Sequence, residues 1–500
     1  MPRASTHFHE RDRARSSGWS LDRYAFIPIL ACAYATIIFP LIIASCSPTD
    51  TVCLLEARPE SRIFWPLLAA ISLIWAARNY SRLNFPPPII YLLAYAALAG
   101  ASILWAFKPE LSFIRFTQQV MIIVSIIVPA MLASRRADLI RGLFLCFALA
   151  AILNLVAVFV RPPIDVKFAT WGYPGYFSGK NYLGEFATLA MLLAFHEALY
   201  PGKRRVFGII IALVSMALLV LSNSKTSIAL AVLAPVLAGV TLFLRKKTRL
   251  SPAILLATLP IGYLVLSSVS GFNVFRLSYI LYSDPTFTGR SIIWDFVNSE
   301  IAQRPLFGWG YQSFWLAGPD APSIVNAPGW VKDMPNAHNG YYDTMVEMGY
   351  AGYALLVTFI VATLHGIGRV ADRAPARAWI VLSLALHVII TNGLESLWMR
   401  GFEMLWIVFV ILAAEVARYW RRPLPVRMPV RGGNRRPGTR PVGPRPFGPA
   451  PGIASRGLRR PIALAERSYP NIAGEPAGAT PPSAPLVATS VNEEPMPSAN

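Results

Sequence analysis

Four basic or titratable side chains stand in short polar segments of an otherwise apolar chain. Lys180 lies in Gly-Lys-Asn, Lys225 in Ser-Asn-Ser-Lys-Thr, Arg290 after Thr-Gly, and His338 before Asn-Gly. Arginine grips phosphate oxygens through a bidentate fork, lysine acts as a point charge, and histidine is the usual general base for a hydroxyl. If they meet, these residues suit a diphosphate leaving group and a hydroxyl nucleophile, which is the chemistry of glycosyl transfer. Arg290 and His338 are the candidate catalytic residues.

Two amides extend this candidate site. Asn181 follows Lys180, and Asn339 follows His338, so both are candidate substrate-binding residues together with Lys180 and Lys225. Each basic residue also has a simpler interpretation. A lone lysine at a membrane interface is usually an anchor, the arginine flanks an amphipathic helix, and the histidine is an ordinary loop residue.

Aromatic side chains follow Pro305 and suit the stacking of sugars. Trp309 and Tyr311 are the candidate substrate-binding aromatics, and the others are Phe314, Trp315 and Trp330. The alternative is an interfacial aromatic belt. The Gly-Trp-Gly run at 308–310 follows no predicted strand and lacks a third glycine, so it does not predict a phosphate-binding loop.

The elements that position these residues are membrane-spanning helices. The chain is 55% hydrophobic and only 14% charged, too few charges to solvate a soluble protein of this size. Apolar runs of roughly 20 residues, enough to cross a bilayer, recur along it. The sequence therefore predicts an all-α, polytopic integral membrane protein with about twelve transmembrane helices. The predicted spans are 24–46, 62–77, 88–107, 117–133, 140–160, 182–200, 206–222, 226–244, 252–270, 347–368, 377–392 and 401–420.

Basic residues gather in every second connection between these spans, which gives the helices a direction. By the positive-inside rule, these connections and both termini are cytoplasmic. The rule also accounts for much of the net charge of +20 without any nucleic-acid partner. All four basic or titratable candidates then fall at the opposite, periplasmic end of the bundle, in a bacterial inner membrane. The basic connections carry Arg78, Arg82, Arg135, Arg136, Arg141, Lys203, Arg204, Arg205, Arg245, Lys246, Lys247, Arg249, Arg369, Arg373 and Arg377.

Three segments outside the spans complete the domain organisation. A basic cytoplasmic segment, 1–23, precedes the transmembrane domain, 24–420, and a Pro/Arg-rich segment, 421–500, is expected to be a disordered cytoplasmic tail. The single long periplasmic loop, 271–346, carries a helix-like stretch at 290–304 that is expected to rest on the membrane face.

The four cysteines carry little functional information. Cys46 and Cys53 fall in the first outer loop and either form a disulfide or stay unpaired. Cys32 and Cys146 lie within spans and are expected to be packing residues.

Three stretches resemble the superfamily of bacterial O-antigen ligases and of O-antigen and exopolysaccharide polymerases. They are Tyr-Phe-Ser-Gly-Lys-Asn-Tyr-Leu-Gly at 176–184, Thr-Gly-Arg-Ser-Ile-Ile-Trp at 288–294 with Pro-Leu-Phe-Gly-Trp-Gly at 305–310, and Ala-His-Asn-Gly-Tyr-Tyr at 337–342 with Glu-Met-Gly-Tyr-Ala-Gly at 347–352. The similarity covers roughly 90–415, and the three stretches together are far more specific than any one alone.

The resemblance implies a GT-C-like glycosyltransferase that acts without a metal or other cofactor on an undecaprenyl-diphosphate-linked oligosaccharide donor. It implies that Arg290 contacts the diphosphate and that His338 orients or activates the acceptor hydroxyl. Lys225 stands where many members carry arginine, which keeps the charge but loses the bidentate geometry. The form around Lys180 is closer to exopolysaccharide polymerases than to lipopolysaccharide ligases.

The acceptor and the class of function have alternatives. The acceptor is another lipid-linked glycan in a polymerase and a lipid A core sugar in a ligase, with membrane lipids around either. A polysaccharide transporter or lipid-linked oligosaccharide flippase would also have about twelve spans. Transporters, however, tend to show internal repeats and polar groups at mid-membrane, whereas this sequence shows no evident repeat and its spans carry few central charges. A non-catalytic assembly factor is the third alternative.

Overall fold

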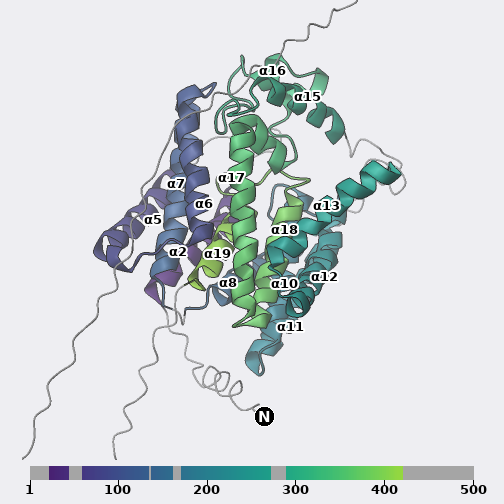
Figure 1. Cartoon of the computed structure of the whole chain (residues 1–500). Helices are drawn as coiled ribbons and strands as arrows, with labels where there is room; N and C mark the ends of the chain where they lie inside the picture. Colours follow the sequence, from purple (N-terminus) through teal and green to yellow (C-terminus); the bar gives the residue numbers. More distant parts are fainter. Residues whose placement is uncertain (1–21, 44–58, 135–136, 161–170, 272–288, 421–500) are drawn as a thin grey trace, which may run out of the picture. The chain divides into compact units, whose positions relative to one another are not determined.

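A computed structural model describes residues 22–43, 59–134, 137–160, 171–271 and 289–420. They all belong to one compact unit, Met1–Val426, and within them every regular element is a helix (Figure 1). The two cysteines of the first outer loop, most of the basic N-terminal segment and the tail 421–500 lie outside the described residues.

Each of the predicted spans coincides with a helix, which confirms the all-α polytopic architecture. The helix at the first span consists of three consecutive segments, which are α2 (Arg23–Ala33), a π-helical turn (Tyr34–Ile38) and α3 (Phe39–Ile43). The others are α5 (Pro59–Arg78), α6 (Pro87–Ala101), α7 (Pro109–Leu132), α8 (Leu139–Val160), α10 (Lys180–Ala198), α11 (Lys203–Ser222), α12 (Lys225–Thr248), α13 (Pro252–Ser270), α17 (Gly340–Ala371), α18 (Pro375–Thr391) and α19 (Met404–Arg418). The remaining elements are α15 (Arg290–Gln303), α16 (Pro322–Val325) and 3-10 turns at Tyr80–Arg82, Ser102–Trp105 and Gly329–Asp333.

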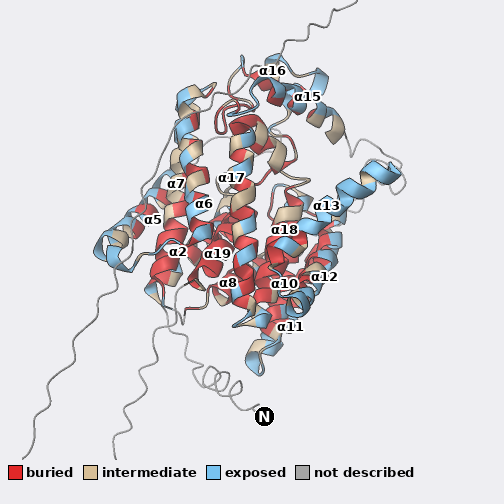
Figure 2. Cartoon of the chain, viewed as in Figure 1, coloured by how far each residue is buried: buried red, intermediate tan, exposed pale blue. Residues whose placement is uncertain are grey.

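Nine helices of the described chain are long and apolar enough to cross a membrane. The other three at predicted spans are α10, which carries several polar residues, and the shorter α18 and α19, of 17 and 15 residues. These three are largely buried among the other helices (Figure 2), and in α19 every residue is buried. A helix enclosed by protein need not match the bilayer in length or apolarity, so the exact number of spans stays a prediction.

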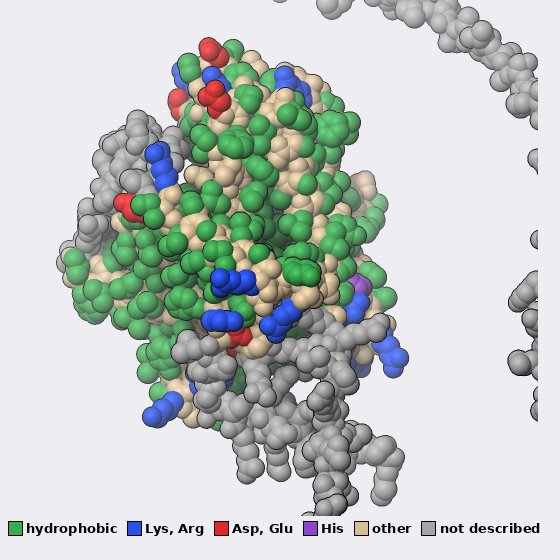
Figure 3. All heavy atoms as spheres, turned by 90° about the vertical axis from the view of Figure 1, so that its left-hand side faces the viewer, with side chains coloured by type: hydrophobic (Ala, Val, Ile, Leu, Met, Phe, Trp, Pro, Cys, Tyr) green, Lys and Arg blue, Asp and Glu red, His purple; other side chains and the backbone are tan. Residues whose placement is uncertain are grey.

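The predicted cytoplasmic connections meet at one end of the bundle. Arg377 bridges Asp138 at 2.7 Å and Glu415 at 2.6 Å, and Arg418 bridges Glu415 at 2.6 Å. Burial acts to raise the pKa of Asp138, but Arg377 and the backbone N–H of Arg141 hold it below its usual value. The surface in Figure 3 is hydrophobic across its middle, with charged side chains toward its two ends, as expected of a protein embedded in lipid.

Two helices extend past their predicted spans and support the long loop. α7 includes residues expected in a loop at 108–116, and there the Arg115 guanidinium donates to the Gln312 carbonyl, while the Lys108 backbone N–H donates to Ser313 Oγ at 2.6 Å. α17 likewise begins at Gly340 rather than near 347. Polar residues of these outer turns contact the loop, so an apolar run could not reveal them.

A break in α17 accommodates part of that loop. Gly349 interrupts the helix with φ +64°, and residues 305–310, which we call the strap, cross the break. The backbone N–H groups of Trp309 and Gly310 donate to the carbonyls of 346 and 347 at 2.9 and 2.8 Å, and those of 350 and 351 donate to the carbonyls of 305 and 306 at 2.8 and 3.1 Å. A Cβ on Gly349 would lie 2.2 Å from the Leu306 carbonyl carbon. The Gly-Trp-Gly run therefore serves close backbone packing.

The loop has a small core of its own. The predicted stretch at 290–304 is indeed a helix, α15, and most of its apolar residues are buried against the loop and α17, while Ile292 is exposed. Phe314, Trp315 and Val331 fill the other side of this core. Cys32 and Cys146 are buried in the main core, with their sulfur atoms 3.9 Å apart, as expected of packing residues.

Candidate active site

The carboxylate of Glu395 joins three of the predicted site residues. Arg290 Nη2 lies 2.9 Å from Glu395 Oε1, His338 Nδ1 lies 3.2 Å from Oε2, and Asn181 Nδ2 donates to Oε1 at 3.4 Å. Arg290 is the first residue of α15, Asn181 lies in the first turn of α10, and His338 precedes α17. Elements far apart in the sequence thus converge at one point, as the alternating topology predicts.

His338 is held by the backbone around it. Its φ of +47° lies in the left-handed region, where residues other than glycine are uncommon. The side chain of Asn336 accepts a hydrogen bond from the His338 N–H at 2.9 Å. The Asn339 side chain then caps α17 by accepting from the N–H groups of Tyr341 and Tyr342 at 3.0 and 3.3 Å. Strained backbone of this kind is frequent at functional sites.

The turn that carries Glu395 is bound to the same cap. The Gly340 N–H donates to the carbonyls of Asn392 and Glu395 at 2.9 and 3.0 Å, and the Asn339 N–H donates to Ser396 Oγ at 3.0 Å. A Cβ on Gly340 would lie 2.4 Å from Asn392 Oδ1, so only glycine allows this approach. His338 and Glu395 are therefore positioned by one hydrogen-bonded unit.

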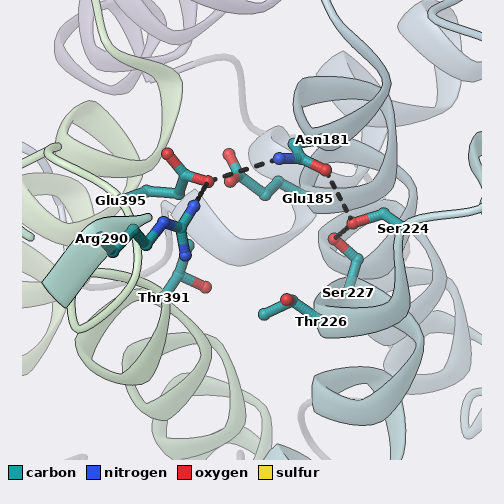
Figure 4. A pocket seen from close by; sticks show the side chains of 8 residues that line it. All are labelled: Asn181, Glu185, Ser224, Thr226, Ser227, Arg290, Thr391 and Glu395. Atoms are coloured by element: carbon teal, nitrogen blue, oxygen red, sulfur yellow. Dashed lines mark hydrogen bonds and ion pairs between the residues drawn. The ribbon is translucent and has the colours of Figure 1, made fainter. Parts of the chain in front are cut away.

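The start of α12 closes the opposite side of the site. Ser224 Oγ donates to Asn181 Oδ1 at 3.3 Å and lies 3.0 Å from Ser227 Oγ (Figure 4). A Cβ on Gly184 would lie 2.7 Å from Ser224 Cβ and 2.7 Å from Ser227 Oγ, so this glycine sets how closely α10 and α12 approach. The two serines and Asn181 form a continuous hydrogen-bonded path to Glu395.

A small polar pocket lies between these elements. It is lined by Asn181 and Glu185 of α10, Ser224 and residues 226–227 of the α12 start, Arg290, and Thr391 with Glu395. In Figure 4, Arg290 and Glu395 approach it from one side and the α10 and α12 residues from the other. The volume open to the centre of a water molecule is about 40 Å³.

The two predicted lysines lie beside this pocket rather than in it. Lys180 and Lys225 are the first residues of α10 and α12, beside the pocket-lining residues 181 and 224, but neither lysine lines the pocket. Lys225 is exposed and Lys180 is half-buried. The structure brings both lysines to the same end of the bundle, as expected.

Three residues that were predicted to contact the substrate have side chains that bind other parts of the protein. The Asn339 side chain is occupied by capping α17 and by donating to the Gly393 carbonyl at 3.1 Å. Tyr311 is 1% exposed, and its hydroxyl donates to the Met399 carbonyl at 2.6 Å. Trp309 donates to the Glu300 carbonyl at 3.2 Å and carries the Arg304 guanidinium 4.0 Å over its ring. Neither aromatic residue lines the pocket, because both anchor the loop.

In chemical terms, the carboxylate of Glu395 contacts both a candidate base, His338, and a cation, Arg290. A neutral imidazole that donates from Nδ1 to Glu395 leaves Nε2 as a proton acceptor. The His338 side chain is 33% exposed, so a substrate hydroxyl can reach it. The Arg290 guanidinium carries five N–H donors, and its contact with Glu395 is made through Nη2. Such an arrangement can deprotonate a hydroxyl and stabilise developing phosphate charge.

Glu395 and Glu185 are the functional candidates that the sequence analysis did not name. A single acid in the short loop 393–400 produces no periodicity and no motif. The predicted topology could have pointed to them, because both acids fall at the same predicted end of the bundle as Arg290 and His338. Glu185 is 4% exposed near the start of a predicted span, and a buried acid at such a place is a functional hint.

Two comparisons with known proteins bear on the family of this chain. Residues 209–357 match the family model described as O-Antigen ligase, a region that contains the α12 start, Arg290 and His338. The chain is 25% identical over 289 residues to the "Exopolysaccharide production protein ExoQ" of Rhizobium meliloti (strain 1021). That alignment covers 55% of this chain and 65% of the relative, slightly less than two thirds of its length. The resemblance to the superfamily of O-antigen ligases and polysaccharide polymerases is thereby confirmed.

Proposed function

We propose that this protein is a glycosyltransferase of polysaccharide biosynthesis, which transfers lipid-linked glycan at the periplasmic face of a bacterial inner membrane. The observation that carries the proposal is the meeting of Arg290 and His338 on Glu395, at the end of the bundle opposite the basic connections. The superfamily match supports glycan transfer, and the likeness to an exopolysaccharide production protein favours polymerisation over transfer to a lipid A core.

In the proposed reaction, His338 Nε2 takes the proton of an acceptor hydroxyl as its oxygen attacks the anomeric carbon of the donor sugar. The bond between that carbon and the diphosphate oxygen breaks, and undecaprenyl diphosphate leaves with the bonding electrons. Arg290 stabilises the negative charge that develops on the diphosphate, with Lys180 and Lys225 nearby as further cations. Glu395 holds the imidazole in the tautomer that can accept the proton. The proposal keeps the expectation of a GT-C-like, metal-independent reaction.

The test uses the purified full chain in lipid nanodiscs with an undecaprenyl-diphosphate-linked oligosaccharide. We expect release of undecaprenyl diphosphate together with a lengthened glycan. Arg290→Ala and His338→Ala should each lower the rate about 100-fold or more, because each removes charge or proton-transfer stabilisation of the transition state. Lys332→Ala, an exposed basic residue of the same loop, is the matched control and should retain the wild-type rate.

Two results would count against the proposal. Unchanged turnover in both site variants would show that the cluster is not catalytic. Movement of the lipid-linked oligosaccharide across the bilayer, without glycan transfer, would instead support the flippase alternative.

A further inference from the structure

The pocket beside Arg290 contains two buried polar atoms that no side chain satisfies. Glu185 is 4% exposed, and its Oε2 has no hydrogen-bond partner among the described residues. Thr391 is 2% exposed, and its Oγ is likewise unpartnered there. Both residues line the pocket. Because a buried polar group without a hydrogen bond is destabilising, two such atoms at one cavity indicate a ligand that supplies hydrogen bonds.

The charges of the pocket select the chemistry of that ligand. Glu185 and Glu395 both line it, and the cationic residue of this lining, Arg290, is already paired with Glu395 at 2.9 Å. A phosphate inside would therefore face two acidic side chains and no cation free of a carboxylate partner. A neutral hydroxyl can hydrogen-bond to the carboxyl group of Glu185 and accept from the hydroxyl of Thr391, so it would satisfy both unpartnered atoms.

The size of the pocket narrows the choice further. A volume of about 40 Å³ open to water centres holds about three or four water molecules at about 10–15 Å³ each. A whole sugar ring does not fit, but a hydroxyl-bearing arm such as the hydroxymethyl group of a hexose does. The ring itself would then lie outside, toward His338 and Arg290.

We infer that this pocket is a specificity subsite for a hydroxyl-bearing arm of the sugar substrate, with Glu185 as the residue that recognises the hydroxyl. The inference rests on the proposed function and deepens it, because it states which chemical feature of the glycan the enzyme reads. A site built to hydrogen-bond a hydroxyl strongly rejects the analogue that lacks it.

The test measures binding without turnover, so it does not depend on catalysis. The probes are the methyl glycosides of glucose, galactose and mannose, each paired with its 6-deoxy analogue, added to the full chain in nanodiscs. Dissociation constants come from ligand-observed NMR. We expect wild-type protein to bind at least one hexoside about tenfold more tightly than its deoxy partner, which corresponds to ~1.4 kcal/mol.

Two variants should reduce that preference. Glu185→Ala should bring the ratio of the two dissociation constants close to one, and Thr391→Val, which keeps the side-chain shape, should lower it in part. Glu110→Gln is the control, an exposed acid in the first turn of α7, and it should retain the wild-type ratio. If Glu185→Ala does not fold, the Thr391→Val ratio decides the test.

The outcomes separate this inference from the proposed function. If the wild-type protein shows no preference in any pair, or the variants retain it, the subsite is refuted even where glycan transfer proceeds normally. If the preference depends on Glu185 but no glycan is transferred, the subsite stands and the proposed catalytic function fails.

Discussion

At the scale of single residues, the site depends on one acid that serves two partners. Glu395 contacts a base through one carboxylate oxygen and a guanidinium through the other. A carboxylate in this position fixes the tautomer of the imidazole and the orientation of the arginine. We therefore regard Glu395 as a positioning residue.

Glu395→Gln should lower kcat by about 10–100-fold while the KM for the donor changes little, because the amide keeps the shape but not the charge. Glu395→Asp should restore part of kcat. The measurement is glycan transfer in nanodiscs over a range of donor concentrations. Equal losses in the Gln and Asp variants, together with a lower melting temperature, would indicate a purely structural role.

Residue types predicted the site better than they predicted its individual contacts. Arg290 and His338 could be selected because their side chains suit diphosphate and hydroxyl chemistry, and the topology placed them together. Asn339 and Tyr311 could not be assigned correctly in this way. Their type suits sugar binding, but their side chains are occupied by a helix cap and by a carbonyl inside the protein. Only three-dimensional contacts distinguish these roles.

At the scale of elements, the break in α17 is the feature that attaches the loop to the bundle. Gly349→Ala should destabilise the protein by about 2 kcal/mol or more, because the new Cβ would meet the strap backbone and φ is positive. The measurement is thermal unfolding in detergent. Gly262→Ala is the matched control, since a Cβ there meets nothing within 4 Å, and it should be neutral or slightly stabilising. Equal melting temperatures for the two variants would contradict this role of the break.

A second test at the scale of elements concerns Glu300, a buried acid of α15. Burial raises the pKa of Glu300, although Gln303 and Asn326 each donate a hydrogen bond to its Oε1 at 3.0 Å. The folded protein therefore binds this proton more tightly than the unfolded chain does. Its contribution to stability falls as the pH rises from the unfolded pKa through the raised folded pKa.

Glu300→Gln removes this titration. The melting temperature of the variant, measured relative to wild type, should rise as the pH is raised from 5 to 8. Glu110→Gln, at an exposed acid, should give a difference that does not change with pH. A constant difference for Glu300→Gln as well would show that this carboxyl group does not titrate differently on folding.

At the scale of the whole molecule, hydropathy and charge predicted the helices and their alternation. Every predicted span became a helix, and the basic connections meet at one end. The outer turns of α7 and α17 were missed because polar residues there pack against the loop. The strap and the α17 break were missed because backbone contacts between distant segments leave no periodicity in the sequence.

The orientation of the bundle can be tested with single cysteines in a background where the native cysteines are replaced by serine. Asp320→Cys lies at an exposed position of the long loop, and Lys203→Cys is exposed at the start of α11. A membrane-impermeant maleimide should label the first in intact spheroplasts and the second only after lysis. Labelling in the reverse order would invert the proposed topology.

The enclosed position of α19 has a consequence for how the protein is made. α19 packs against α2, α6, α7, α17 and α18, yet all of these helices leave the ribosome before it. Until α19 is synthesised, the surfaces of these helices that contact it can therefore be covered only by lipid or by one another. A chain released before Met404 would be a bundle without its centre, and such an intermediate is a natural substrate for membrane proteases. Assembly is thus completed, and the protein protected from degradation, only in the last step of synthesis of the helical domain.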